Sequence, residues 1–254
     1  MTEDLGKIKN KSLEKAVRVL NCFIEKQPLG ITEISEKLGL YKSNVYDILS
    51  TLTALEFAVK DEESNKYYLG IGALRLGRAA AQRYSFQEIA APHIRQIAKE
   101  AGEICYLTIP NGYEVYYLDA AIPNDSNSFL ASSLRNSTDP MNATGSGKAM
   151  LAHMPEDFVE AFLAQPMQAL TEYTITDPEQ MRAELALIRQ RGYSVDNMEN
   201  SIGLKCVAVP ILTRKGQLVG AMSVSGPSLR FTEDKIKHFI EVLQNHLALI
   251  QQSL

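Results

Sequence analysis

The feature that most restricts the fold of this 254-residue chain is a run of three short helical patterns followed by two strand patterns. Apolar residues recur every three or four positions over 12–25 and again after Ser43, and Gly39 ends the helix between them. Residues 57–60 and 66–69 are β-prone and flank a polar turn. This order predicts a winged helix-turn-helix.

Each predicted helix has a candidate cap and a candidate buried face. We expect Ser12 to cap the first helix, Thr32 the second and Ser43 the third. The first helix should bury one stripe, formed by Leu13, Ala16, Val17, Leu20, Phe23 and Ile24. The second should bury Ile34 and Leu38, and the third Val45, Ile48, Leu49, Leu52 and Leu55.

The outward positions of the third helix are short or polar, so they could reach base edges in a major groove. Lysines at the base of the predicted hairpin could meet phosphates, whereas the acidic residues at its tip would be repelled by them. Any pair of helices joined by a tight turn shows part of this pattern, so a protein-binding adaptor is the alternative. The candidate DNA contacts are Thr32, Lys42, Ser43, Asn44, Tyr46, Asp47, Ser50, Lys60 and Lys66.

The formal net charge of −4 is unevenly distributed. Residues 1–85 hold 13 basic and 11 acidic side chains, whereas the rest of the chain holds 13 basic and 19 acidic ones. This weak asymmetry permits phosphate binding by the first part without requiring it. Two ordinary solvated surfaces would explain it equally well.

We expect the winged module to end near residue 70, a linker helix to cover 71–85, and a second domain to cover 86–254. The second domain has strand patterns at 104–109, 115–121, 128–134, 193–196, 204–212 and 218–225. Helical patterns lie near 86–101, 147–153, 156–163 and 178–190, and a last helix follows a Thr232 cap. Without strict strand–helix alternation, this order predicts an α+β domain with an antiparallel sheet.

Nothing in the sequence indicates an enzyme or a bound cofactor. Gly145-Ser146-Gly147-Lys148 lacks the first glycine and the final hydroxyl of a phosphate loop. It fits either a plain tight turn or a helix start that binds an anion. Cys206 would ordinarily be a buried structural cysteine, and Asp196 an exposed loop acid. Ser223 and Ser225 point to the same strand face, as a polar strand end also would.

The N-terminus lacks a signal-peptide pattern, and no apolar run is long enough to cross a membrane. Three widely spaced cysteines fit neither a disulfide framework nor a zinc site. We therefore expect a reduced, cytoplasmic protein without a membrane partner.

Four stretches together resemble the IclR family of bacterial transcriptional regulators. They are the winged module around 31–34 and 42–46, the turn 143–149, the segment 203–210, and 223–227 followed by 230–232. They occur in the family's order and spacing and span nearly the whole chain. The resemblance implies a GAF-like effector domain for a small carboxylate, and homodimers or homotetramers on palindromic operator DNA.

The resemblance also implies a set of effector contacts. Gly145 and Ser146 would donate backbone N–H groups to the carboxylate, and Asp196, Cys206, Ser223 and Ser225 would supply polar side chains. Met141 would be an apolar wall. The competing hypothesis is an enzyme that acts on its ligand through Cys206, although no base is identifiable near it.

Two positions depart from the family pattern. Asp47 stands where a non-acidic residue is usual after the recognition-helix tyrosine, which predicts a different operator sequence. Asp139 replaces a commonly apolar residue and would add hydrogen-bonding capacity if it faces the pocket. We therefore expect a more hydroxylated effector than glyoxylate, such as a sugar acid.

Overall fold

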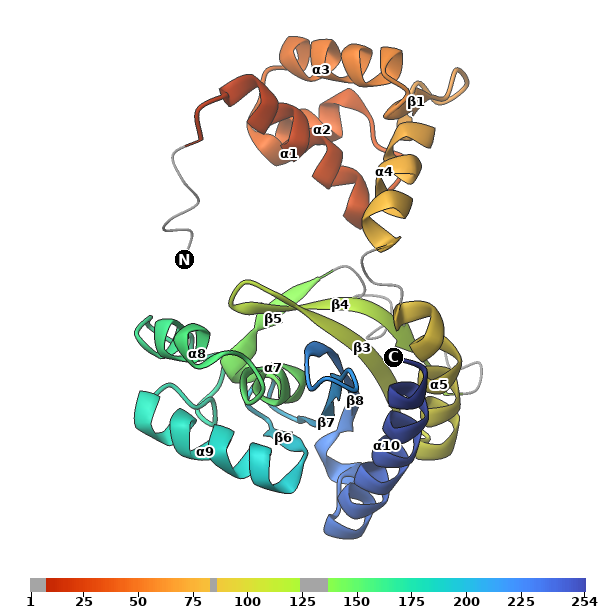
Figure 1. The fold of residues 1–254 in the computed structure, drawn as a ribbon. Coiled ribbons are helices and arrows are strands. Elements are labelled where there is room, and N and C mark those ends of the chain that lie inside the picture. The colour runs from red at the N-terminus through yellow and green to blue at the C-terminus, as the bar shows by residue number, and fades with distance from the viewer. Residues whose placement is uncertain (1–7, 83–85, 124–136) are drawn as a thin grey trace. The chain divides into compact units, whose positions relative to one another are not determined.

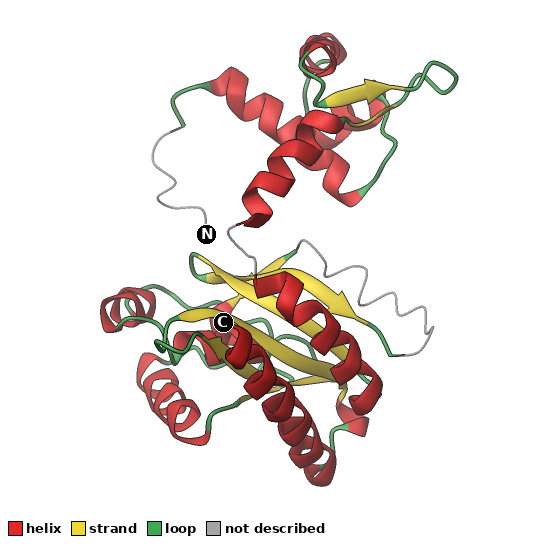
Figure 2. Ribbon diagram, turned by 45° about the vertical axis from the view of Figure 1, so that its right-hand side comes forward, coloured by secondary structure: helices red, strands yellow, loops and turns green. Residues whose placement is uncertain are grey.

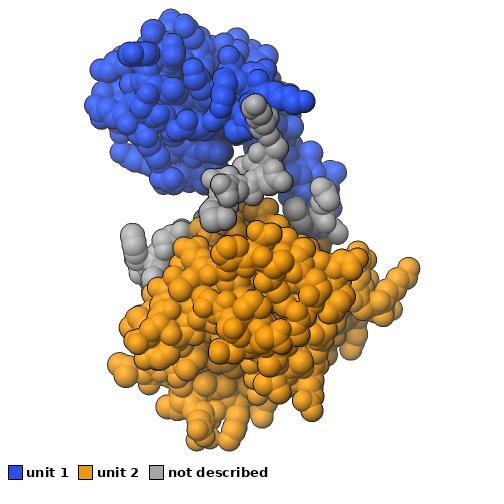
Figure 3. Space-filling view, turned by 90° about the vertical axis from the view of Figure 1, so that its left-hand side faces the viewer, with its two compact units in different colours: residues 1–84 blue, residues 85–254 orange. Residues whose placement is uncertain are grey.

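The computed structural model of this protein describes residues 8–82, 86–123 and 137–254. The chain forms two compact units, residues 1–84 and 85–254, which Figure 3 colours separately. In the described ranges, no helix is both long and apolar enough to cross a bilayer.

Unit 1 has the predicted order of three helices, a hairpin and a further helix. These are α1 (Lys11–Glu25), α2 (Ile31–Leu38), α3 (Lys42–Ala54), β1 (Ala58–Lys60), β2 (Tyr67–Leu69) and α4 (Ile71–Ala81), as Figure 1 shows. The two strands pair antiparallel, with Val59 opposite Tyr68. The winged helix-turn-helix prediction is confirmed.

Helix α1 differs from the prediction in its cap and in its buried face. Asn10, not Ser12, is the N-cap, because its side-chain oxygen accepts the N–H groups of Ser12 and Leu13. Apolar residues lie on more than one face of this helix, and only one of those faces meets α2 and α3. The buried residues are Val19, Cys22 and Phe23, whereas Leu13, Val17 and Ile24 are exposed.

The caps of α2 and α3 also lie before the predicted ones. Gly30 is the N-cap of α2, and the Glu33 carboxylate accepts its N–H at 2.8 Å. Thr32 is therefore already inside the helix. Tyr41 is the N-cap of α3, with an extended backbone and no side-chain cap, so Ser43 lies in the first turn.

The turn between α2 and α3 is built as the sequence predicts. Gly39 has a φ of 64°, the left-handed conformation that suits glycine at the end of a helix, and its N–H bonds the Ser35 carbonyl. The core of unit 1 then brings together residues from all its early elements. It contains Val19, Cys22, Phe23, Leu29, Ile34, Val45, Leu49, Leu52, Ala58 and Tyr67. Leu55, predicted to face inward, is 59% exposed.

Unit 2 is built on one six-stranded antiparallel sheet, in the order β5-β4-β3-β8-β7-β6. The strands are β3 (Ile104–Asn111), β4 (Glu114–Ala121), β5 (Thr138–Pro140), β6 (Ser194–Asn197), β7 (Leu204–Leu212) and β8 (Leu218–Pro227). The predicted antiparallel α+β class is confirmed. The strand expected at 128–134 lies outside the described residues, and β5 was not predicted.

Helices cover both faces of this sheet (Figure 2). Helices α5 (Phe86–Ala101) and α10 (Glu233–Ser253) pack against each other on one face. Helices α7 (Gly145–Leu151), α8 (Glu156–Leu163) and α9 (Pro178–Arg191) lie on the other (Figure 1). The Thr232 hydroxyl accepts the Lys235 N–H, so the predicted cap of α10 is observed.

Candidate functional site

The outward face of α3 presents polar side chains one turn apart. Ser43, Tyr46, Asp47 and Ser50 are exposed, and Tyr46 is 55% exposed. Their spacing of three or four residues places them on one side of the helix. Asn44 is half-buried at the edge of this face. The exposed side chains have the lengths and polar groups that base edges require.

The lysines predicted to meet phosphates differ in their surroundings. Lys42 is exposed, and within the described residues it has no acidic partner. Lys66 lies 3.1 Å from Glu33, which also pairs with Lys26. The Gly30 N–H, followed by these two lysines, lowers the pKa of Glu33 to about 2. Lys66 is therefore partly neutralised, whereas Lys42 is free to contact a phosphate.

In unit 2, strand register gathers polar residues on the sheet face that α7 covers. Asp196 lies opposite Cys206, and Cys206 lies opposite Ser225. Ser223 lies opposite Tyr106 on β3. Because directly opposed residues of an antiparallel pair point to the same face, side chains from four strands meet there.

These side chains line a cavity of about 40 Å³. Six of the eight predicted effector contacts are in its wall: Gly145, Ser146, Asp196, Cys206, Ser223 and Ser225. The other lining residues are Tyr106, Tyr117, Thr144, Asn200 and Leu204. Met141 and Asp139 are not in the wall. Met141 is fully buried in the apolar core beneath α7 and α8, because the chain turns into the core before α7 begins.

Helix α7 begins at this cavity. Thr144 is its N-cap and accepts the Gly147 N–H at 3.0 Å, so the helix starts two residues before the predicted 147. The N–H groups of Gly145 and Ser146 are in the first turn, where an α-helix has no partner for them. A Cβ on Gly145 would lie 3.0 Å from the Cys206 sulfur, and one on Gly147 would lie 2.3 Å from the Met141 carbonyl oxygen. Glycine is needed at position 147, because a Cβ there would overlap the Met141 backbone, whereas a Cβ at position 145 would require the Cys206 side chain to shift.

Asp196 is a buried acid, not the exposed loop residue that its sequence context suggests. Its Oδ1 accepts the Glu199 N–H at 2.7 Å, which fixes the turn after β6. Burial raises the pKa of Asp196 to about 7 despite this hydrogen bond. Near neutral pH, Asp196 is therefore present in both protonated and ionised forms.

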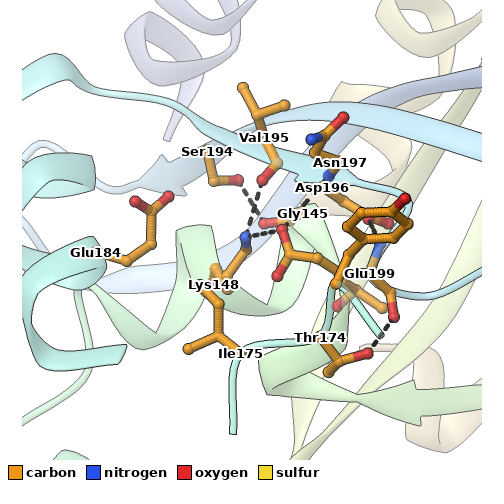
Figure 4. Close-up of polar contacts among 12 residues, drawn as sticks. Gly145, Lys148, Thr174, Ile175, Glu184, Ser194, Val195, Asp196, Asn197 and Glu199 are labelled. Atoms are coloured by element: carbon orange, nitrogen blue, oxygen red, sulfur yellow. Dashed lines mark hydrogen bonds and ion pairs between the residues drawn. The ribbon is translucent and has the colours of Figure 1, made fainter. Parts of the chain in front are cut away.

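Behind Asp196 lies a buried ion pair (Figure 4). The Lys148 ammonium donates to Glu199 at 2.5 Å and to the Val195 carbonyl at 2.8 Å. The side chains of Lys148 and Glu199 are only 1% and 6% exposed. The Thr174 hydroxyl donates to the Glu199 carbonyl at 2.6 Å. These contacts hold the segment after β6 against α7, so they position Asp196 at the cavity.

Cys206 has no features of a nucleophile. Burial, followed by the charge of Asp196, raises its pKa to about 12. The side chain is therefore a thiol at neutral pH, and a thiol is a poor nucleophile. This disfavours the enzyme hypothesis, which relied on Cys206.

Family comparison agrees with both units. The model "IclR helix-turn-helix domain" matches residues 12–62, and the model "Bacterial transcriptional regulator IclR C-terminal" matches residues 78–250. The chain belongs to the IclR family of transcriptional regulators.

IclR-family relatives align over most of this chain. The HTH-type transcriptional regulator BhcR of Paracoccus denitrificans is 33% identical over 92% of this chain and 83% of its own length. The HTH-type transcriptional repressor AllR of Escherichia coli is 30% identical over 89% and 83%. These relatives are regulators, and this chain is likewise a DNA-binding regulator rather than an enzyme.

Solved IclR structures share the fold. The Thermotoga maritima IclR structure is 33% identical, with a TM-score of 0.79, and covers 96% of this chain and 98% of that one. An IclR homolog from Microbacterium hydrocarbonoxydans, solved with 4-hydroxybenzoate, is 23% identical with a TM-score of 0.81. It covers 95% of this chain and 98% of that one.

Five cavity residues of this IclR-family chain were not predicted: Tyr106, Tyr117, Thr144, Asn200 and Leu204. A β-bulge between Leu107 and Thr108 shifts the pairing of β3 with β4. It places Tyr117 against Tyr106, with ring centroids 5.2 Å apart. Strict alternation along β4 does not reveal this. Asn200 is in a turn, where no periodicity in the sequence indicates which way a side chain points.

Proposed function

We propose that this regulator binds a palindromic operator through α3 and the hairpin, and that a small carboxylic acid in the unit 2 cavity changes its affinity for that operator. The observation that carries the proposal is the cavity itself, where polar groups from five strands, α7 and a turn converge. Because the operator would be chromosomal, the protein would act in the cytoplasm.

The carboxylate end of the effector would lie at the start of α7. Backbone N–H groups of Gly145 and Ser146 would donate to the carboxylate, as helix N-termini do for anions. Among the residues that the structure describes, no lysine or arginine lines the cavity. The protonated form of Asp196 would leave the carboxylate unrepelled, and the hydroxyls of Ser223 and Ser225 would complete its hydrogen bonds.

We further propose that the operator-bound form is a homodimer or a homotetramer. Unit 1 exposes apolar side chains on two helices: Leu13, Val17 and Ile24 on α1, and Ile71, Leu74 and Leu76 on α4. A second copy that covers them would remove this area from water. Two copies are also what an inverted repeat requires, with recognition helices about 34 Å apart.

The effector can regulate only by favouring one arrangement of the dimer over another. A coupling of about 1–3 kcal/mol gives roughly 5- to 150-fold change in operator affinity. We propose residues 71–85 as the connection that transmits this change between residues 1–70 and 86–254.

Fluorescence anisotropy with labelled DNA from upstream of the protein's own gene tests the proposal. We expect tight binding to a fragment that contains an inverted repeat, and a shift in affinity on adding a short carboxylic acid. Binding no tighter than to scrambled DNA contradicts the operator part. Unchanged affinity with every acid contradicts the effector part.

A further inference from the structure

Helices α5 and α10 meet through two histidine rings, on the sheet face opposite the one that α7 covers (Figure 2). His93 is on α5 and His246 is on α10, and their Nδ1 atoms lie 2.9 Å apart. The rings are packed edge to face, with centroids 5.2 Å apart. Both side chains are partly buried, and neither lines the effector cavity. The contacts proposed above for DNA and for the effector therefore leave this pair unused.

A hydrogen bond between two Nδ1 atoms needs a single hydrogen. A ring nitrogen accepts only when it carries no proton, so one ring donates and the other accepts. If both Nδ1 atoms are protonated, two N–H groups face each other and two positive charges lie side by side. The contact between His93 and His246 therefore holds only while one of these two nitrogens is without a proton.

A carboxylate next to the pair decides which ring donates. Glu100 on α5 lies 3.6 Å from His246 Nε2. A hydrogen bond from the Gln96 amide, followed by the charge of His246, lowers the pKa of Glu100, so this carboxyl group is ionised at neutral pH. Next to that negative charge, His246 can carry a proton on both nitrogens. His246 Nδ1 is then the donor, and His93 Nδ1 is the acceptor.

The other titratable groups that face this contact leave the assignment unchanged. His238, also on α10, is exposed, and its charge acts on Glu100. On the sheet, Asp119 of β4 acts on the Cys105 thiol of β3, whose pKa is raised mainly by burial. Strands β7 and β8 contribute buried apolar side chains to this face. None of these groups supplies a carboxylate to His93 in the part of the chain that the structure describes.

We infer that His93 and His246 form a proton-sensitive contact that holds α5 on α10 at neutral pH and weakens in mildly acidic solution. The step is the binding of a proton from solvent to His93 Nδ1, which then no longer accepts from His246. Burial, followed by the charge of His246, lowers the pKa of His93. The unfolded chain binds this proton near pH 6.5, whereas the folded chain resists it, so stability falls as pH falls below about 6.5.

The place of this contact in the chain gives it a regulatory meaning. Helix α5 is the first element of unit 2 after residues 71–85. The histidine pair fixes this helix to α10, the last element of the chain. Acidification would therefore loosen the segment through which the chain enters unit 2, while the cavity on the other face of the sheet keeps its own contacts.

Histidine-ring NMR of the full-length wild-type protein tests this inference directly. The chain has four histidines, so labelled rings give few signals. We expect His93 to stay neutral, with its proton on Nε2, at a pH where the exposed His238 is already half protonated. If His93 titrates together with His238, the inference is overturned.

A substitution that keeps the acceptor but removes the titration gives a second test. In His93→Asn, the amide oxygen can still accept from His246 Nδ1, and it does not bind a proton in this pH range. Urea denaturation of unit 2 should show that the folding equilibrium constant of the wild type falls at least about threefold more than that of His93→Asn between about pH 7.5 and pH 5. Taking the difference between the two proteins removes the contribution of Asp196 and other groups.

A control and an alternative complete the experiment. His238→Asn, on the same helix but exposed, should keep the pH dependence of the wild type. Equal pH dependence of the wild type and His93→Asn overturns the inference. Two imidazole nitrogens at this spacing could also bind a transition-metal ion. If Zn²⁺ raises the unfolding temperature of the wild type but not of His93→Asn, the pair is a metal site and the proton-sensitive contact is overturned. If His93→Asn does not fold, the NMR titration of the wild type decides.

Discussion

The polar residues of the two units are in opposite environments. On α3, the side chains proposed to contact DNA are exposed to solvent. In unit 2, Asp196, Lys148, Glu199 and Ser223 are all buried and most have partners within the protein. A DNA surface can supply its own hydrogen bonds to exposed groups, whereas a small ligand must be bound by groups that folding has already removed from water. Substitutions should therefore affect binding in unit 1 and stability in unit 2.

The largest loss of stability should come from removing one partner of the buried Lys148–Glu199 ion pair. Lys148→Met would leave the Glu199 carboxylate buried without its cation, because Lys148 is the only ammonium that contacts it in the described part of the chain. Loss of one partner of a buried pair costs about 3–5 kcal/mol. Urea denaturation should show this decrease in the free energy of unfolding of unit 2.

A control pair in the same unit makes this comparison quantitative. Arg182 and Glu160 are 40% and 49% exposed, so solvent screens their attraction and Arg182→Met should lower the free energy of unfolding far less than Lys148→Met. The double variant Lys148→Met, Glu199→Leu should recover most of the loss, because no charge remains buried. Equal losses in the free energy of unfolding for Lys148→Met and Arg182→Met would mean that burial does not make the Lys148–Glu199 pair more important for stability than an exposed pair.

Most elements of unit 1 could be predicted because its patterns are local. The Gly39 turn, the inward face of α3 and the hairpin each follow from residues a few positions apart. The buried face of α1 could not be predicted so well. Leu13 and Val17 fit a helical stripe, but the tertiary contacts of α1 use Val19 and Cys22 instead.

In unit 2, the family resemblance predicted most of the polar cavity residues, because the positions of a family motif can be assigned to this sequence one by one. Contacts between segments that lie far apart in the sequence could not be predicted. Glu199 lies 51 positions from Lys148, and neither residue has a local signal that indicates the other. Tyr117 required a β-bulge that no alternation rule contains. Register and bulges thus limit what a single sequence can show of this site.

The next effect in size concerns the paired hydroxyls of β8. Ser223→Ala with Ser225→Ala should abolish the response to the effector, since both hydroxyls line the cavity, while operator affinity stays within about twofold. Operator anisotropy with and without acid measures both quantities. Ser228→Ala, beyond the end of β8 and outside the cavity wall, is the control. Loss of folding in the double variant would instead assign these serines a structural role.

A smaller effect is the pH dependence of effector affinity. Asp196, with a pKa of about 7, becomes ionised as pH rises through 7 and then repels a bound carboxylate. Affinity should be highest below pH 7 and fall about tenfold by pH 8. Calorimetry at pH 6 and pH 8 measures this change in affinity, and Asp196→Asn should remove it.

The same raised pKa affects stability. Because folded Asp196 holds its proton to a higher pH than unfolded Asp196, unit 2 should lose stability as pH rises between about 4 and 7.

The smallest effect distinguishes two lysines of unit 1. Lys42→Ala should weaken binding to all DNA sequences alike and reduce the slope of log K against log salt by about 0.9, which corresponds to one phosphate contact. Lys66→Ala should change the slope by less than half of that, because Glu33 already neutralises part of its charge. Anisotropy titrations at several salt concentrations give both slopes. Equal changes would show that DNA binding displaces Lys66 from Glu33, so that the hairpin is as open to phosphates as the start of α3.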